Sequence, residues 1–230
     1  MRIGCAASAR FPSGLDSDDS ANEMAQSPER QMTIIDYYIS LNSPWTYLGS
    51  ARFAAIAKKH DCTVNVKPAK FSEVFARTGG LPLAKRAPER RAYRLMDLKR
   101  WRDHLGIPIN IEPKYFPSDE APGTRLVLAA KLQGKDAHRL ATEIGKALWE
   151  MEQSIADPAA LAAAAERAGI DAEAIRKAGP SDAELDGIHD ELTAEAIKRG
   201  VFGAPSYVLA SGEIFWGQDR LEFLDRALAR

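Results

Sequence analysis

Residues 33–70, TIIDYYISLNSPWTYLGSARFAAIAKKHDCTVNVKPAK, contain two strand patterns separated by a helix pattern. TIIDYYISL has the β-branched and aromatic content of a buried strand. The next nineteen residues have helical spacing, Asn42 or Ser43 can cap the helix, and Pro44 suits its first position. CTVNVKPAK alternates in valine and predicts a second strand that ends near Pro68. The stretch therefore predicts a right-handed β-α-β unit.

A long block of helices is expected after this unit. PERRAYRLMDLKRWRDHL, residues 88–105, places apolar side chains on one side and Arg and Lys around the other, and it ends at Gly106. The prolines of GIPINIEPKYFP exclude regular structure in the segment that follows. Further helices are expected at residues 124–133, 136–153, 158–169, 171–179 and 181–200.

The last thirty residues return to sheet and end in a helix. PSYVLAS, Gly212 and EIFWG predict a hairpin of two short strands. DRLEFLDRALAR predicts an amphipathic helix capped by Asp219, with Glu222 completing a capping box. Without the helical block, the order β-α-β and then β-β-α is close to the thioredoxin core. The expected fold class is α/β: a thioredoxin-like fold with a large all-helical insertion between its β-α-β and β-β-α halves.

The chain is expected to have three parts. Residues 1–31 are polar, small and acidic, which predicts a disordered N-terminal extension without the apolar region of a secretion signal. Residues 32–70 and 201–230 are expected to form a thioredoxin-like domain. Residues 71–200 are expected to form the helical insertion domain.

Composition excludes several classes of protein. The 230 residues include 31 Lys and Arg against 32 Asp and Glu, so the net charge of -1 provides no field for nucleic acid or an anionic membrane. No apolar run approaches the roughly 18 residues that span a bilayer. The two cysteines, Cys5 and Cys62, form no C-x-x-C motif, disulfide framework or zinc site. We therefore expect a cytoplasmic protein with no nucleic-acid and no membrane partner.

Basic residues gather between positions 85 and 102, and two interpretations are open. They can form a solvated helix face, which the near-zero net charge favours, or they can attract an anionic substrate. The members of this basic cluster are Lys85, Arg86, Arg90, Arg91, Arg94, Lys99, Arg100 and Arg102. The four histidines have no partner at metal spacing, so no metal site is predicted and they are expected at the surface or at helix ends. They are His60, His104, His138 and His189.

The start of the first helix, Ser43-Pro44-Trp45-Thr46, suits anion binding. Free backbone N–H groups and the helix dipole stabilise an anion such as a thiolate there. Hydroxyls stand at both positions where a C-x-x-C motif has its sulfurs, which excludes dithiol–disulfide exchange at this place. Ser43 can donate a hydrogen bond to the sulfur of a bound molecule, or it can cap the helix and nothing more.

Two further places, late in the chain, carry residues suited to binding. In GVFGAPS, residues 200–206, Pro205 can begin an edge strand, or it can be a cis proline whose preceding residue pairs with an extended peptide. At Gln218-Asp219-Arg220, Asp219 can be a simple helix cap. Alternatively, the carboxylate and guanidinium there can hold the ammonium and carboxylate of an amino-acid moiety.

DYYISLNSPWTYLG, GVFGAPSYV and FWGQDRL, in this order, resemble the 2-hydroxychromene-2-carboxylate isomerases and the related kappa-class glutathione transferases. These belong to the thioredoxin-like group that includes DsbA-type oxidoreductases. The resemblance extends from Thr33 to Arg230 and includes the helical insertion. It implies an enzyme that uses glutathione as a cofactor, acts on a small-molecule aromatic substrate and forms a homodimer.

The resemblance also implies roles for particular residues. Ser43 is the expected catalytic residue and faces the glutathione sulfur. Pro205 is expected to be cis, with Ala204 pairing to the tripeptide backbone. Asp219 and Arg220 are expected to bind the γ-glutamyl end.

One stretch departs from the family pattern. The T-G-N … P-x-K stretch of the family corresponds here to Thr78-Gly79-Gly80 … Pro88-Glu89-Arg90. Gly80 supplies no amide side chain, and Arg90 is the expected stand-in for the lysine as a cofactor-binding residue. Trp45, Phe71, Tyr93 and Trp101 are candidates for an apolar wall around the aromatic substrate, with core packing as the alternative.

The resulting hypothesis is glutathione-dependent isomerisation by reversible thiolate addition to a conjugated bond. Lowering a thiol pKa from about 8.5 to about 6.5 needs roughly 2.7 kcal/mol of thiolate stabilisation. A charge-assisted hydrogen bond from Ser43 contributes about 1.5–3 kcal/mol and the helix dipole about 0.3–1 kcal/mol. The alternatives are a kappa-type transferase that conjugates electrophiles and a non-catalytic thioredoxin-like binding module.

Overall fold

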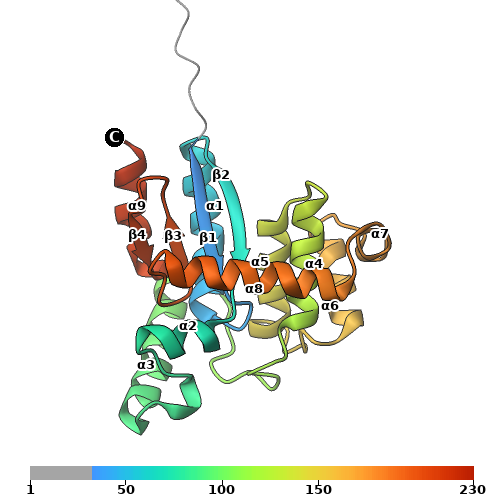
Figure 1. Ribbon diagram of the computed structural model, residues 1–230. Coiled ribbons are helices and arrows are strands. Elements are labelled where there is room, and N and C mark those ends of the chain that lie inside the picture. Colours follow the sequence, from blue (N-terminus) through green and yellow to red (C-terminus); the bar gives the residue numbers. More distant parts are fainter. Residues whose placement is uncertain (1–32) are drawn as a thin grey trace, which may run out of the picture. The chain divides into compact units, whose positions relative to one another are not determined.

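A mixed four-stranded sheet forms the framework of the computed structural model (Figure 1). β1 (Ile34–Ile39) pairs in parallel with β2 (Thr63–Pro68). β3 (Ser206–Val208) lies antiparallel between β1 and β4 (Ile214–Trp216), so the strand order is β2-β1-β3-β4. The structure describes residues 33–230, and the expected disordered extension lies outside the described residues.

α1 (Pro44–Lys59) connects β1 to β2, as the helix pattern predicts. Ser43 is its N-cap, with a side chain that accepts a hydrogen bond from the Thr46 N–H. The helix packs on the sheet through aromatic rings, since the Tyr37 and Tyr207 rings are stacked at 5.1 Å and Phe53 lies 4.5 Å from Tyr207. The predicted β-α-β unit is thus confirmed.

The block between β2 and β3 is helical throughout, apart from its connecting loops. Its elements are α2 (Phe71–Thr78), the 3-10 helix η1 (Leu83–Lys85), α3 (Pro88–Leu105), α4 (Ala121–Leu132), α5 (Ala137–Trp149), α6 (Pro158–Arg167), α7 (Ala172–Ala178) and α8 (Asp182–Lys198). The sequence patterns predicted every α-helix of the block except α2. That helix has eight residues, and its N-cap residue Lys70 makes no side-chain cap, so the usual start signal is missing.

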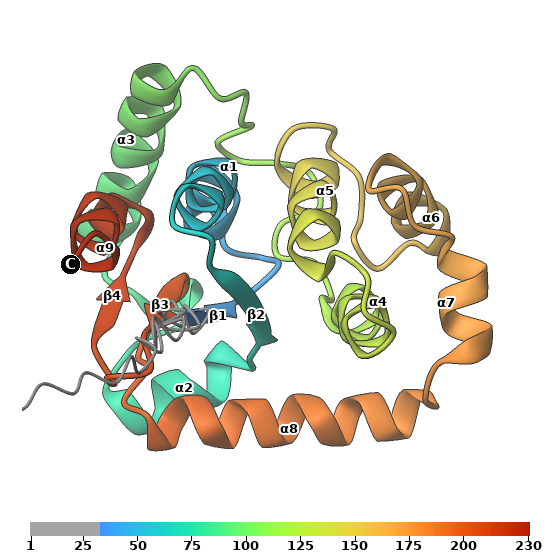
Figure 2. The ribbon, with the colours of Figure 1, turned by 90° about the horizontal axis from the view of Figure 1, so that it is seen from above.

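Figure 2 shows α1 between α3 on one side and α5 on the other, and these neighbours are in contact. α8 runs from α2 to α7 on the face of the sheet opposite α1. Buried Lys67 of β2 ties it there, because its Nζ lies 3.0 Å from the Asp36 carboxylate of β1 and 2.7 Å from the Glu195 carboxylate of α8.

The helical insertion and the sheet share one hydrophobic core. Ile35 and Phe53 of the thioredoxin-like part belong to the same buried cluster as Leu126, Ile144 and Trp149 of the insertion. Residues 32–230 form one compact unit. The expected thioredoxin-like domain and the expected helical insertion are recognisable as successive groups of elements along the chain. Their side chains, however, pack into one common hydrophobic core. No helix within residues 33–230 is long and apolar enough to cross a membrane.

The expected cap of the last helix is wrong. A 3-10 turn, η2 (Gln218–Arg220), precedes α9 (Leu221–Leu228) and contains Asp219. The Asp219 carboxylate accepts a hydrogen bond from Arg220 at 2.6 Å, while Glu222 pairs with Arg226 one turn further on. α9 consequently begins without a side-chain cap.

Two other expectations on exposure are corrected. On α3 the apolar side faces little core: Leu98 is fully buried, but Tyr93 and Met96 are 55% and 49% exposed. His189 is only 7% exposed. His138 contacts the rings of Tyr37 and Phe53 and bonds Ser50 at 3.1 Å. Tertiary packing, which helical spacing does not encode, determines both outcomes.

Candidate functional site

The start of α1 meets the segment before β3. Ser43 has extended backbone angles (φ −83°, ψ 117°), which turn its side chain over the first helical turn. Its Oγ accepts a hydrogen bond from the Thr46 N–H at 3.2 Å and donates one to the Ala204 carbonyl at 3.3 Å. The Ala204–Pro205 peptide bond is cis, as the resemblance implies. The fold thus joins two of the three places singled out in the sequence.

A polar clamp holds the residue before Ser43. The Asn42 side chain donates to the Ser118 carbonyl at 2.8 Å and accepts from the Ser118 N–H at 3.0 Å. The Glu120 carboxylate accepts from the Asn42 N–H at 3.1 Å and from the Ser40 hydroxyl at 2.8 Å. Burial raises the pKa of Glu120. The position of Ser43 therefore depends on a loop of the insertion, which nothing in the sequence patterns indicated.

A cavity of about 610 Å³ opens beside this junction. Its thioredoxin wall consists of Trp45, Ala204, Trp216, Gly217, Gln218, Asp219 and Arg220. Its α3 wall consists of Arg86, Glu89, Arg90, Tyr93, Arg94, Met96, Asp97 and Trp101. Seven predicted site residues meet here, namely Trp45, Arg90, Tyr93, Trp101, Ala204, Asp219 and Arg220. Ser43 and Pro205 do not line the cavity themselves. Ser43 is hydrogen-bonded to the lining residue Ala204, and Pro205 follows Ala204 in the chain.

The structure does not bring Phe71 to this cavity. Phe71 starts α2 and is 6% exposed in a second core cluster with Tyr38, Val74 and Val208. Core packing, the alternative considered for the aromatic candidates, is its role. Trp101, by contrast, lies in the α3 wall.

The departure at Gly80 has a steric cause. A Cβ at this position would lie 2.5 Å from Cδ1 of the Phe75 ring, so an amide side chain does not fit while that ring stays in place. The guanidinium of Arg86 lies 6.0 Å from the centre of the same ring. The segment therefore presents a guanidinium on an aromatic ring rather than an amide.

Arg52 of α1 holds the turn η2 in the thioredoxin wall. Its guanidinium donates to the Gln218 carbonyl at 3.0 Å and also to the Gln218 side chain, which is 2% exposed. Gly49 lets the helix come this close, because a Cβ there would lie 2.8 Å from Cβ of Gln218. Burial lowers the pKa of Arg52. These contacts place Asp219 and Arg220 at the cavity.

Charge is divided along the cavity. Burial and the nearby Asp219 carboxylate raise the pKa of Asp97, against a smaller opposing effect of Arg100. Burial and the nearby Arg86 lower the pKa of Arg94 to about 10. The cavity thus has an acidic end at Asp97 and Asp219 and a basic end at Arg86 and Arg94, where the carboxylate of Glu89 also belongs to the lining. Sequence reasoning did not single out Asp97 or Trp216, and it favoured a solvated face for the arginines.

Thiol exchange and metal chemistry find no support in residues 33–230. Cys62 is the only cysteine in this range, and it precedes β2, at the opposite end of α1 from Ser43. Since α1 has 16 residues, the two positions are separated by about 24 Å along the helix axis. The same residues contain no group of three His, Cys, Asp or Glu side chains that could hold a metal ion.

The chain is similar along most of its length to proteins with two named activities. The 2-hydroxychromene-2-carboxylate isomerase of Sphingobium xenophagum is 29% identical over 196 residues, which cover 84% of this chain and 97% of the relative. Glutathione S-transferase kappa 1 of Homo sapiens is 25% identical over 205 residues, with 84% and 90% covered. A solved 2-hydroxychromene-2-carboxylate isomerase superposes with a TM-score of 0.68 at 26% identity, over 86% of this chain and 95% of that one.

The family is shown by a match that spans nearly all described residues. The DsbA-like thioredoxin domain matches residues 34–229, which include the sheet, the insertion and α9. The order of elements along the chain, β-α-β, a helical block and then β-β-α, is the one expected from the sequence. The chain therefore belongs to the DsbA-like thioredoxin domain family, as a member with hydroxyls in place of both cysteines at the start of α1.

Proposed function

We propose that the protein is a glutathione-dependent isomerase that acts on 2-hydroxychromene-2-carboxylate or a related aromatic acid. The observation that carries the proposal is the Ser43 hydroxyl, which caps α1 3.3 Å from the Ala204 carbonyl beside a cavity of about 610 Å³. The names of the relatives, isomerases and a kappa-class glutathione transferase, support it.

Ser43 is the proposed donor to the cofactor sulfur. The Ser43 hydroxyl donates to the Ala204 carbonyl at 3.3 Å, which is long for an O–H donor. A thiolate at the start of α1 carries a full negative charge and is therefore a better acceptor for this proton. The N-terminus of α1 adds the favourable field of its dipole. When bound, glutathione supplies a thiolate that adds to a conjugated bond of the substrate and is later expelled.

The ends of the tripeptide find matching groups in the cavity. Asp219 and Asp97, at the acidic end, suit the γ-glutamyl ammonium, and Arg220 suits its carboxylate. Arg90 suits the glycyl carboxylate. The aromatic side chains of Trp45, Tyr93 and Trp101 line the remaining space, which fits an aromatic substrate.

Replacement of the serine tests the proposal. Ser43→Ala should lower glutathione-dependent turnover of 2-hydroxychromene-2-carboxylate at least 100-fold, since the sulfur loses its hydrogen bond. Ser181→Ala is the matched control, because Ser181 caps α8 in the same way but its side chain bonds only Glu184 of its own capping box, which is outside the cavity lining. Both variants lose a helix cap, worth about 1 kcal/mol of stability. Equal turnover in the two variants would remove Ser43 from the mechanism.

Conjugation is the second candidate function, favoured by the similarity to the human kappa-class transferase. Product analysis separates the two reactions, because isomerisation returns glutathione whereas conjugation consumes it and leaves a thioether. If calorimetry finds no binding of glutathione at millimolar concentration, neither reaction stands and a non-catalytic binding module is the better description.

We also propose that the enzyme acts in the cytoplasm as a homodimer. The support for both is the similarity to the isomerases and to the kappa-class transferase. Sedimentation equilibrium tests the assembly. A mass close to the 25.2 kDa of one chain would contradict the dimer.

A further inference from the structure

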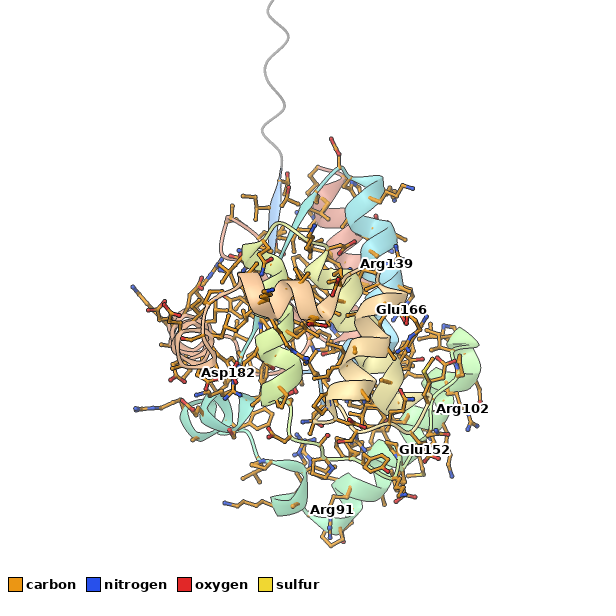
Figure 3. All side chains as sticks on the ribbon, turned by 90° about the vertical axis from the view of Figure 1, so that its right-hand side faces the viewer. Arg91, Arg102, Arg139, Glu152, Glu166 and Asp182 are labelled. Carbon is orange, nitrogen blue, oxygen red and sulfur yellow. The ribbon has the colours of Figure 1, made fainter. Side chains whose placement is uncertain are left out.

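Three arginines of the basic cluster belong to the lining of the cavity. Arg86, Arg90 and Arg94 line the α3 wall. Arg91 of the same helix is exposed and lies outside the lining, and Figure 3 shows it with Arg102 on the α3 part of the chain. The cluster is therefore divided between a solvated side and a side turned to the cavity.

Arg94 is held on aromatic rings without an acidic partner. Its guanidinium carbon lies 5.2 Å from the centre of the Phe116 ring and 5.9 Å from that of Trp149, which is fully buried. Within residues 33–230 it makes no ion pair, and Glu112 attracts it only from a longer range. Ring stacking leaves the edge of a guanidinium free to donate. A partly buried cation of this kind gains free energy when an anion binds beside it.

Arg86 approaches the same end of the cavity from η1. Its Nε donates to the Leu81 carbonyl at 2.8 Å, and its guanidinium lies over Phe75 at 6.0 Å. Its terminal nitrogens have no hydrogen-bond or ion-pair partner in the described chain. Burial and the neighbouring Arg90 lower the pKa of Arg86, and Arg86 in turn lowers that of Arg94. Like charges are thus held together where an anion would relieve their repulsion.

We propose that Arg86 and Arg94 form an anion-binding subsite that takes the carboxylate of an aromatic substrate. Each guanidinium is a planar group with parallel N–H donors, the arrangement that recognises a carboxylate, and the neighbouring rings suit the aromatic body of the same molecule. The inference deepens the proposed function and rests on it for the role of the cavity. In this assignment, Arg90 and the acidic end of the cavity bind glutathione.

Calorimetry with cinnamate and with its uncharged amide, cinnamamide, tests the subsite without glutathione. Wild-type protein should bind cinnamate about tenfold or more tightly than cinnamamide, since only the acid offers a charge to the guanidiniums. Arg94→Met and Arg86→Met should each remove most of this difference while the affinity for cinnamamide stays the same. Arg91→Met, which removes a charge of the same helix outside the cavity, should keep the difference.

Several results would overturn the subsite. They are no binding of cinnamate at millimolar concentration, equal affinities for acid and amide, or an equal loss in the Arg91 variant. Should Arg94→Met fail to fold, as near-ultraviolet circular dichroism would reveal, Arg86→Met decides alone, because Arg86 packs on the partly exposed Phe75 rather than on the core.

A second titration distinguishes the two sources of carboxylate. S-methylglutathione also carries carboxylates, and its affinity should change less than threefold in Arg94→Met and Arg86→Met. If S-methylglutathione loses as much affinity as cinnamate, the arginines serve the cofactor and the inference fails. Ser43→Ala should bind cinnamate like the wild type, so loss of turnover in that variant reports on the proposed function and leaves the subsite standing.

Discussion

The two walls of the cavity are held by different interactions. At the thioredoxin wall, Ser43 bonds the Ala204 carbonyl and Arg52 bonds Gln218, so polar contacts connect α1 and its cap to η2 and to the segment before β3. The α3 wall has one fully buried side chain on its helix, Leu98, while Tyr93 and Met96 are about half exposed. Polar contacts thus fix the thioredoxin wall and the adjoining Ser43, which is proposed to bind the glutathione sulfur. The α3 wall, whose helix has few buried side chains, carries the arginines proposed to bind the substrate.

Leu98→Ala should produce the largest loss of stability, because it removes the one buried anchor of α3. Truncation of a fully buried leucine costs about 2–5 kcal/mol. Met96→Ala, on the same helix but 49% exposed, should change the free energy of unfolding by less than about 0.5 kcal/mol. Urea unfolding of both variants provides the comparison. Similar losses at the two positions would mean that the whole apolar side of α3 is buried in solution.

His138 lies where the helical block meets α1, and its pKa predicts a pH dependence. Burial lowers the pKa of His138 from 6.5 to about 4. Between pH 6.5 and pH 4, His138 is protonated in the unfolded chain but stays neutral in the folded chain. Stability is therefore complete above pH 6.5 and falls as the pH drops towards 4, by roughly 3 kcal/mol in total.

Unfolding measured at pH 7.0, 5.5 and 4.5 checks this dependence, with His138→Asn as the variant. That substitution removes the titrating ring, so the part of the slope between pH 6.5 and 4 that belongs to His138 should disappear. Exposed His104 is the control, since His104→Asn should leave the slope unchanged. A slope as steep in His138→Asn as in the wild type would assign the acid sensitivity to other groups, such as the buried His189.

Local signals account for most of what could be predicted from the sequence. Ser43 before Pro44 marks the start of α1, and Pro88 and Gly106 mark both ends of α3, because caps depend on the backbone of adjacent residues. The family resemblance added the cis bond before Pro205, since sequence alone does not distinguish the isomers.

Packing between distant segments accounts for what could not be predicted. Helical spacing put Tyr93 and Leu98 on one side of α3, but only Leu98 meets the core. Asp219 has the residue type of a cap, yet the contact of η2 with Arg52 through Gln218 places it one residue before the N-cap of α9, which is Arg220. The guanidinium of Arg94 reaches the cavity because Phe116 and Trp149 lie behind it, and both come from other segments.

Arg52→Met tests how firmly the thioredoxin wall is held. The variant loses hydrogen bonds from a charged group to the buried Gln218, which costs about 1.5–3 kcal/mol of stability. Because η2 carries Asp219 and Arg220, KM for glutathione should rise more than kcat falls. Arg226→Met, on exposed α9, is the control and should change neither quantity. An unchanged KM would mean that the turn keeps its position without Arg52.

Gly80→Asn tests the steric reason for the departure in the α3 wall and has the smallest expected effect, about 1–3 kcal/mol of stability. Its Cβ would meet the Phe75 ring at 2.5 Å, and moving that ring also removes the support of Arg86. Selectivity for cinnamate over cinnamamide should therefore fall together with stability. Gly79→Asn is the control, because its Cβ has open space and asparagine tolerates the positive φ of 77°.

The double variant Gly80→Asn with Phe75→Ala decides between steric and other causes. If the ring alone excludes the amide, Gly80→Asn should cost almost nothing in a protein that already lacks the ring, so the two changes are strongly non-additive. Additive losses of stability would show that Gly80 is required by its own backbone instead. Cinnamate selectivity should stay low in the double variant, because the ring under Arg86 is still missing, and its recovery would separate Arg86 from that support.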